Sequence, residues 1–150
     1  MKSVQHWVVD ASVALKWYLE DESDVRQAEH LWNAFAAGET TLVAPHYIRY
    51  EIANALEVAR VQGRISQEQA DEKLTSFLGT DVYLEADDDA LLLAAIGATR
   101  RYEVTPYDGL YLALAESLGF GFVTADRDLY RHVRDEISYI HWISSVRVDA

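Results

Sequence analysis

The chain has 150 residues, of which 25 are acidic and 13 basic, so its formal net charge is −12. Half of the residues are hydrophobic, which excludes a long disordered segment, and the length fits a single domain spanning residues 1–150. Cysteine is absent, which excludes disulfides, thiolate zinc sites and cysteine nucleophiles.

The apolar segments are short. The longest uninterrupted one, Ala90–Ile96, is far below the roughly 20 residues that a membrane-spanning helix needs. The N-terminus lacks the apolar core of a secretory signal. We therefore expect a cytoplasmic protein without membrane contact. A net charge of −12 also repels nucleic acid, so a nucleic-acid function would require a local basic rim, metal ions or a basic partner.

The first part of the chain predicts strands alternating with helices. A strand at residues 4–9 is followed almost at once by a helix at 12–19. A second helix, 24–37, ends at Gly38 as its C-cap, and a short strand follows at 41–44.

The alternation continues to the end of the chain. Pro45 opens a long helix that runs to about Gln62, and Ser66-Gln67-Glu68-Gln69 has the spacing of a capping box. The remaining elements are a helix at 66–78, a strand at 82–85, helices at 88–99 and 108–118, a strand at 120–124, a helix at 126–134 and a strand at 139–143. This pattern predicts an α/β fold, a three-layer α/β/α sandwich around a parallel sheet of about five strands.

Three acidic residues stand where a predicted helix begins. Asp10 follows a predicted strand directly, Asp126 follows another after one residue, and Asp108 heads the helix at 108–118. Each could simply be an N-cap, which is worth about 1 kcal/mol. In parallel sheets, however, binding sites also collect at the carboxyl ends of strands.

Glu51 has no capping role to explain it. It lies one helical turn from Ile48 and from Ala55, on the edge of the predicted buried face of its helix. An unpaired carboxylate there would cost several kcal/mol, so it requires either a salt bridge, for instance to Arg49 or Arg60, or a bound cation.

Asp108 heads the apolar stripe of its helix, so two acids face the core and two follow strands. They can converge only in a shared pocket, where four carboxylates repel one another unless a metal neutralises them. Oxygen-only ligation suits Mg²⁺ or Mn²⁺. The chemistry this pattern favours is metal-assisted attack of water on a phosphodiester.

The acids lie in four segments, Val8–Trp17, Pro45–Leu56, Tyr107–Ala115 and Phe122–Leu129. In order and spacing, these segments resemble PIN-domain ribonucleases, most closely the VapC-like toxins of type II toxin–antitoxin pairs. The resemblance covers nearly the whole chain. It implies a PIN-like sheet flanked by helices and Mg²⁺- or Mn²⁺-dependent cleavage of RNA.

The resemblance also implies the roles of individual residues. The metal-site and catalytic acids carry over onto Asp10, Glu51, Asp108 and Asp126, and hydroxyls that support the site carry over onto Ser12 and Thr124. Asp128 could replace or assist Asp126 as the fourth ligand. The chain departs from the family at Gly109, where alanine is more usual.

Basic residues near the acid motifs are candidates for binding substrate phosphate. Lys16 faces either phosphate or solvent, and Arg49, Arg127 and Arg131 flank the motifs. Each arginine is equally explained as an ordinary surface or ion-pairing residue.

A chain this acidic is suited to a cognate antitoxin that is basic, and its aromatic content makes a homodimer an expectation. Two alternatives remain. One is an acid-rich α/β phosphohydrolase, although Ser12 stands where haloacid-type phosphatases place a second aspartate. The other is a non-catalytic PIN-like interaction module, which would be expected to have lost one or two of the acids.

Overall fold

The computed structural model describes residues 3–147 and contains one five-stranded sheet in the order β3-β2-β1-β4-β5. The strands are β1 (Gln5–Val9), β2 (Thr40–Pro45), β3 (Tyr83–Glu85), β4 (Gly121–Thr124) and β5 (Ile140–Trp142). Every neighbouring pair is parallel. The predicted α/β fold with a parallel sheet is therefore confirmed.

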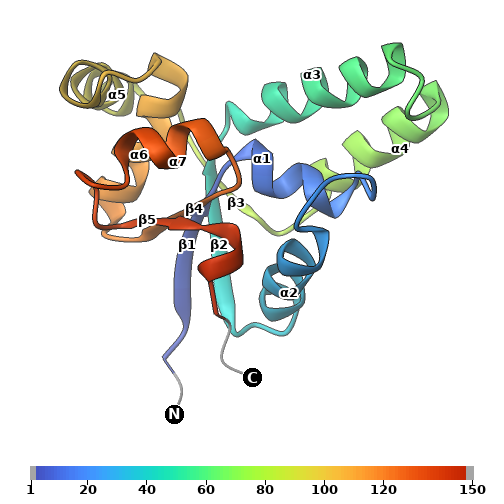
Figure 1. Cartoon of the computed structure of the whole chain (residues 1–150), viewed down its shortest axis with the longest axis horizontal. Helices are drawn as coiled ribbons and strands as arrows, with labels where there is room; N and C mark the ends of the chain where they lie inside the picture. The colour runs from blue at the N-terminus through green and yellow to red at the C-terminus, as the bar shows by residue number, and fades with distance from the viewer. Residues whose placement is uncertain (1–2, 148–150) are drawn as a thin grey trace.

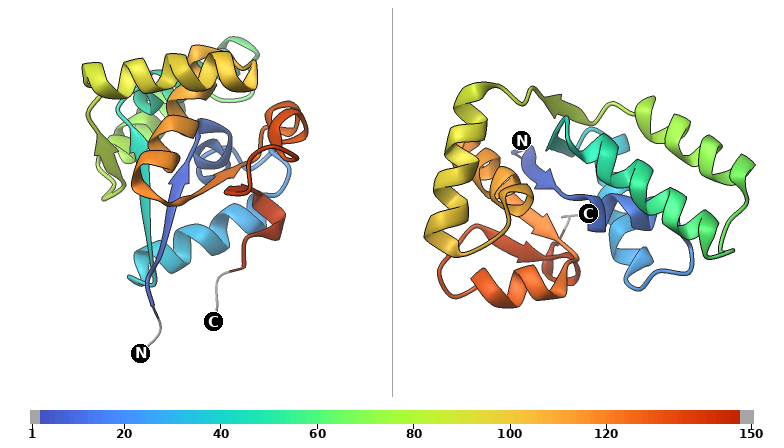
Figure 2. Two further views of the ribbon diagram at one scale, coloured as in Figure 1. Left: turned by 90° about the vertical axis from the view of Figure 1, so that its left-hand side faces the viewer. Right: turned by 90° about the horizontal axis from the view of Figure 1, so that it is seen from above.

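Helices cover both faces of this sheet. They are α1 (Ala11–Ala14), α2 (Val25–Ala36), α3 (Ile48–Val61), α4 (Gln67–Leu78), α5 (Asp89–Tyr102), α6 (Pro106–Leu118) and α7 (Arg127–Val133), with 3₁₀ turns at Leu15–Trp17 and Ile143–Ser145. Seen from above in Figure 2, α5 and α6 lie on one side of the sheet and α1 to α4 on the other. Figure 1 shows α3 and α4 extending outward as a hairpin.

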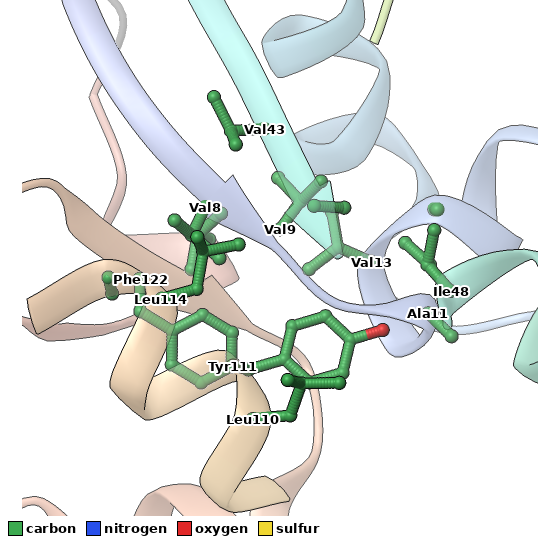
Figure 3. Packing of buried hydrophobic residues seen from close by; sticks show 14 of the residues in the cluster. Val8, Val9, Ala11, Val13, Val43, Ile48, Leu110, Tyr111, Leu114 and Phe122 are labelled. Carbon is green, nitrogen blue, oxygen red and sulfur yellow. The ribbon is translucent and has the colours of Figure 1, made fainter. Parts of the chain in front are cut away.

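The core follows from this layering. Val8 and Val9 point to opposite faces of β1, and both are fully buried because helices cover both faces. Figure 3 shows Leu114 and Tyr111 of α6 packed beside Val8 and Phe122, so that α6 covers the centre of the sheet.

Helix α6 packs closely against α5, and Gly109 makes this contact possible. A Cβ atom at this position would stand 2.5 Å from the carbonyl oxygen of Ala95 and 2.7 Å from Oγ1 of Thr99. The departure from alanine at Gly109 therefore has a steric reason in this chain.

The structure corrects one helix start that bears on the site. Helix α6 begins at Pro106 rather than Asp108, because Thr105 is its N-cap and accepts a hydrogen bond from the backbone N–H of Asp108 over 3.1 Å. The alternative interpretation of Asp108 as an N-cap is therefore wrong, because Thr105 has that position.

Other boundaries differ as well. The helix predicted to open at Pro45 begins at Ile48, because Pro45 is still the last residue of β2. The helix predicted at 12–19 is only the single turn of α1 followed by a 3₁₀ turn, and α5 continues to Tyr102 rather than ending at Thr99. Within residues 3–147, no helix combines the length and the apolar character that crossing a membrane would require.

Candidate active site

The candidate site lies at the carboxyl ends of β1 and β4, where the strand order reverses. Strands β2 and β3 are added on one side of β1, whereas β4 and β5 are added on its other side. Parallel α/β sheets bind ligands at such a point. Val9 pairs with Val123 in the register of these strands, so the segments carrying Asp10 and Asp126 leave the sheet side by side.

Asp10 is held by three hydrogen bonds. It is 7% exposed, and Oδ1 accepts from Ser12 Oγ and, over 3.2 Å, from the backbone N–H of Val13. Oδ2 accepts from Oγ1 of Thr124. Asp10 is thus the N-cap of α1, as its position predicted, but its second oxygen faces the neighbouring strand.

Ser12 and Thr124 join the segment of Asp10 to that of Asp126. Ser12 Oγ accepts from the backbone N–H of Ala125 over 2.9 Å, and Thr124 Oγ1 accepts from the N–H of Asp126 over 3.0 Å. The Asp126 carboxylate in turn caps α7 by accepting from the N–H of Leu129 over 3.1 Å. Both hydroxyls therefore lie where they fix the relative positions of two acids.

Glu51 lies in the first turn of α3 and accepts a hydrogen bond from the hydroxyl of Tyr111 on α6, over 2.5 Å. Neither expected salt bridge is present. Arg60 pairs with Glu57 instead, and the Nε of Arg49 donates to a backbone carbonyl one turn earlier. The salt-bridge interpretation of Glu51 is therefore wrong for these two arginines.

Burial and mutual repulsion raise the pKa values of three of the acids. Burial raises the pKa of Asp10 from 3.8 to about 6, against three hydrogen bonds that lower it, and the charge of Asp126 adds a smaller increase. Burial raises the pKa of Glu51 to about 7, to which the charges of Asp10 and Asp108 contribute while the Tyr111 hydrogen bond opposes it. The pKa of Asp108 is raised mainly by burial and secondly by the negative charge of Asp126.

These couplings place the four acids in one electrostatic unit. Asp126, and not Asp128, is the charge that acts on Asp10 and on Asp108. Asp128 is exposed on the first turn of α7.

No positive charge in residues 3–147 compensates this unit, since none of its carboxylates takes part in an ion pair. Across the same residues, no three side chains of the metal-binding types converge closely enough to enclose an ion. The donor chemistry nevertheless fits a hard divalent cation, because every group is a carboxylate or hydroxyl oxygen. Mg²⁺ in particular keeps several waters and needs few protein ligands.

The basic candidates take different positions. Lys16 is buried, and its ammonium donates to the backbone carbonyl of Ser23 over 2.6 Å. Arg49 is half-buried, with its guanidinium 5.8 Å from the ring centre of Tyr50, and Arg127 is exposed, 5.9 Å from the ring centre of Trp142. Lys16 thus holds a loop of its own chain.

Tyr111 is the site residue that the sequence did not reveal. It is 2% exposed and stacks against Phe122, with ring centres 5.9 Å apart. Figure 3 shows its hydroxyl directed toward the side on which Ala11 and Ile48 lie. Tyr111 lies one helical turn after Asp108, and this spacing could have indicated a site residue. The same spacing also fits an apolar core residue.

Comparison with known proteins agrees with this fold. The family model described as PIN domain matches residues 7–135, and the chain belongs to the PIN-domain family. Ribonuclease VapC3 of Pyrobaculum aerophilum is 34% identical over 128 residues, which cover 81% of this chain and 90% of that relative. The resemblance to VapC-like members of the family is thereby confirmed.

Solved structures share the fold at lower identity. PAE2754 from Pyrobaculum aerophilum has a TM-score of 0.68 at 23% identity, covering 97% of this chain and 94% of its own. VapC20 of Mycobacterium tuberculosis, described as a Sarcin-Ricin loop cleaving toxin, has a TM-score of 0.63 at 14% identity, covering 87% and 95%. VapBC2 from Rickettsia felis, bound to a DNA fragment from their promoter, has a TM-score of 0.67 at 11% identity, covering 92% and 98%.

Proposed function

We propose that this chain is an endoribonuclease that depends on Mg²⁺ or Mn²⁺, and that it is the toxin of a toxin–antitoxin pair. One observation carries the proposal: four carboxylates interact at the reversal point of the sheet without an ion pair in the described residues. Two similar proteins support the proposal: one is named Ribonuclease VapC3, and VapC20 is described as a Sarcin-Ricin loop cleaving toxin.

The residues that would hold the cation are Asp10, Glu51, Asp108 and Asp126. A divalent ion bound by these carboxylates would act as a Lewis acid for the phosphodiester and would lower the pKa of a water molecule. Ser12 and Thr124 fix both oxygens of Asp10, so that its orientation does not depend on the ion. This preorganisation reduces the rearrangement needed when substrate enters.

Arg49 and Arg127 form the proposed phosphate-binding rim. They come from α3 and α7, two elements that each begin at the site edge of the sheet. Guanidinium groups suit this function because they contact phosphate oxygens through paired N–H donors.

The proposed antitoxin is a basic protein. A net charge of −12 favours association with a partner of opposite charge. A solved structure from Klebsiella pneumoniae with a TM-score of 0.62 at 10% identity, covering 96% of this chain and 100% of its own, is described as a toxin–antitoxin complex. Co-expression with the neighbouring reading frame and purification of the complex test this proposal. Isolation of a stable complex with an acidic partner would count against it.

Cleavage of single-stranded RNA tests the activity directly. We expect products in Mg²⁺ or Mn²⁺, none with a chelator, and a loss of at least about a hundredfold in Asp10→Asn and Asp108→Asn. Glu57→Gln, on the exposed side of α3, is the matched control and should cleave normally. Activity that survives both aspartate substitutions would exclude this site.

A further inference from the structure

Three tyrosines form a stacked aromatic cluster on the surface. The rings of Tyr47 and Tyr107 lie nearly parallel, at an interplanar angle of 16° with centres 5.0 Å apart. The ring of Tyr50 is tilted by 32° to that of Tyr47, with centres 6.3 Å apart. Tyr50 is 67% exposed and Tyr107 56% exposed. We call these residues the tyrosine platform.

The tyrosine platform borders the acidic site. Tyr50 immediately precedes Glu51, and Tyr107 immediately precedes Asp108. Tyr47 is one helical turn before Glu51, whose backbone N–H donates to the Tyr47 carbonyl over 3.4 Å. The platform therefore unites the starts of α3 and α6, the two helices that carry these acids.

Core packing does not explain the outer rings. Tyr102 and Tyr111 are 6% and 2% exposed, and they contribute to the core as buried tyrosines do. Tyr47 packs against that core and anchors the cluster, whereas Tyr50 and Tyr107 leave more than half of their surface to solvent. The result is a fixed aromatic surface with accessible ring area.

We propose that the tyrosine platform stacks the unpaired bases of single-stranded RNA next to the acidic site. This proposal deepens the nuclease function above and rests on it for the identity of the ligand. Stacking on an aromatic ring stabilises a bound base by about 1–3 kcal/mol and tolerates any base. Bases are available for such stacking in loops and single strands but not within a duplex.

The charge of the chain favours this form of binding. At a net charge of −12, electrostatic attraction cannot supply most of the affinity for a polyanion, whereas stacking is independent of charge. Arg49, with its guanidinium 5.8 Å from the Tyr50 ring centre, adds a local positive charge at the same edge. A base held here brings its adjoining phosphate close to Glu51 and Asp108.

Binding can be measured separately from cleavage. The probe is a fluorescent single-stranded RNA of mixed sequence, with an abasic strand of equal length and a duplex as comparisons. Binding is followed by anisotropy in Mg²⁺ on the Asp10→Asn background, and KM and kcat are measured on the otherwise wild-type chain. If the wild-type chain does not cleave RNA, the nuclease function is refuted, whereas the binding measurement still tests the tyrosine platform.

We expect Tyr50→Ala and Tyr107→Ala each to raise the Kd for single-stranded RNA by about 5- to 150-fold, the equivalent of losing one stacked base. KM should rise by a similar factor with little change in kcat. Tyr50→Phe and Tyr107→Phe keep the ring and should restore affinity. Tyr83→Ala, which removes a 61% exposed tyrosine on β3, is the matched control and should have no effect.

Two results would overturn the proposal. One is an unchanged Kd in the double variant Tyr50→Ala/Tyr107→Ala, with folding verified by circular dichroism. The other is an equal loss of affinity for the abasic strand, which has nothing to stack. If the Kd is unchanged while light scattering shows a change in oligomeric state, the platform is a contact between copies of the chain and the RNA assignment is wrong.

Discussion

The hydroxyl of Tyr111 on α6 donates a hydrogen bond to Oε1 of Glu51 on α3, over 2.5 Å. This contact joins two helices that are distant in sequence and fixes one oxygen of an acid that has no ion-pair partner in the described residues. The same hydrogen bond lowers the pKa of Glu51, opposing the increase that burial causes. Tyr111 therefore acts as a positioning residue for Glu51.

Replacing Tyr111 with phenylalanine tests this relationship. The ring and its packing against Phe122 remain, whereas Glu51 loses its donor. We expect Mn²⁺ affinity, measured by calorimetry, and RNA cleavage each to fall by about tenfold, as for loss of one hydrogen bond to a charged group. Tyr139→Phe removes a hydroxyl that donates to exposed Glu116 over 3.3 Å, and it should leave both measurements unchanged. Equal effects of the two variants would contradict a specific role for Tyr111.

The raised pKa values predict how the stability of the metal-free protein depends on pH. The folded-state pKa values of Asp10 and Glu51 are about 6 and about 7, above their ordinary values of 3.8 and 4.5. Across this interval the folded chain binds protons that the unfolded chain releases, so the free energy of unfolding falls as pH rises from about 4 to about 7. Above about pH 7, the free energy of unfolding has lost the whole contribution from these two groups.

Glu51→Gln isolates this effect because the amide oxygen can still accept from Tyr111. In a chelator, we expect its Tm to match that of the wild type near pH 4 and to exceed it by a few degrees near neutral pH. Mn²⁺ should raise the Tm of the wild type and not that of the variant. Glu57→Gln should show no gain, and a gain equal at all pH values would contradict the account.

The close contact between α5 and α6 predicts a steric effect at Gly109. Gly109→Ala brings a methyl group against the Ala95 carbonyl oxygen, and we expect a loss of about 1–3 kcal/mol in the free energy of unfolding. Gly97→Ala on α5 adds a methyl group with no atom within 4 Å and should be neutral or stabilising by up to about 1 kcal/mol. Denaturant unfolding of both variants measures the difference, and equal stabilities would refute the steric explanation.

Thr124 offers a test of the link between strands β1 and β4. Thr124→Val keeps the shape of the side chain but removes the donor to Asp10 and the acceptor for the N–H of Asp126. We expect a loss of about 1–3 kcal/mol in stability and reduced cleavage. Thr40→Val also removes a buried hydroxyl, one that donates to the Gln5 carbonyl over 2.8 Å, and should affect stability alone.

The sequence was sufficient to predict the parallel sheet and the position of the acids at the ends of its strands. Asp10 directly follows a buried-type strand and Asp126 lies one residue after another. Both residues therefore lie at the same edge of a parallel sheet. The capping alternative for Asp108 stayed open because the Thr105-Pro106 signal, an N-cap followed by proline at the first helical position, was not recognised.

Tertiary contacts account for what the sequence did not reveal. Tyr111 has the spacing of an apolar core residue, and its hydrogen bond depends on the position of α6 relative to α3. Lys16 similarly gave no sign that its ammonium would reach the Ser23 carbonyl, because that contact depends on the path of an irregular loop. Glu51 lies in the first turn of α3, but the two arginines expected to pair with it do not.

Titration calorimetry with Mn²⁺ tests most directly whether the four carboxylates form a cation site. We expect the wild-type chain and Glu57→Gln to bind Mn²⁺ with similar affinity, and the double variant Asp10→Asn/Asp108→Asn to show no binding while remaining folded by circular dichroism. Mn²⁺ binding that persists unchanged in the double variant, or no binding by the wild type, would contradict the account.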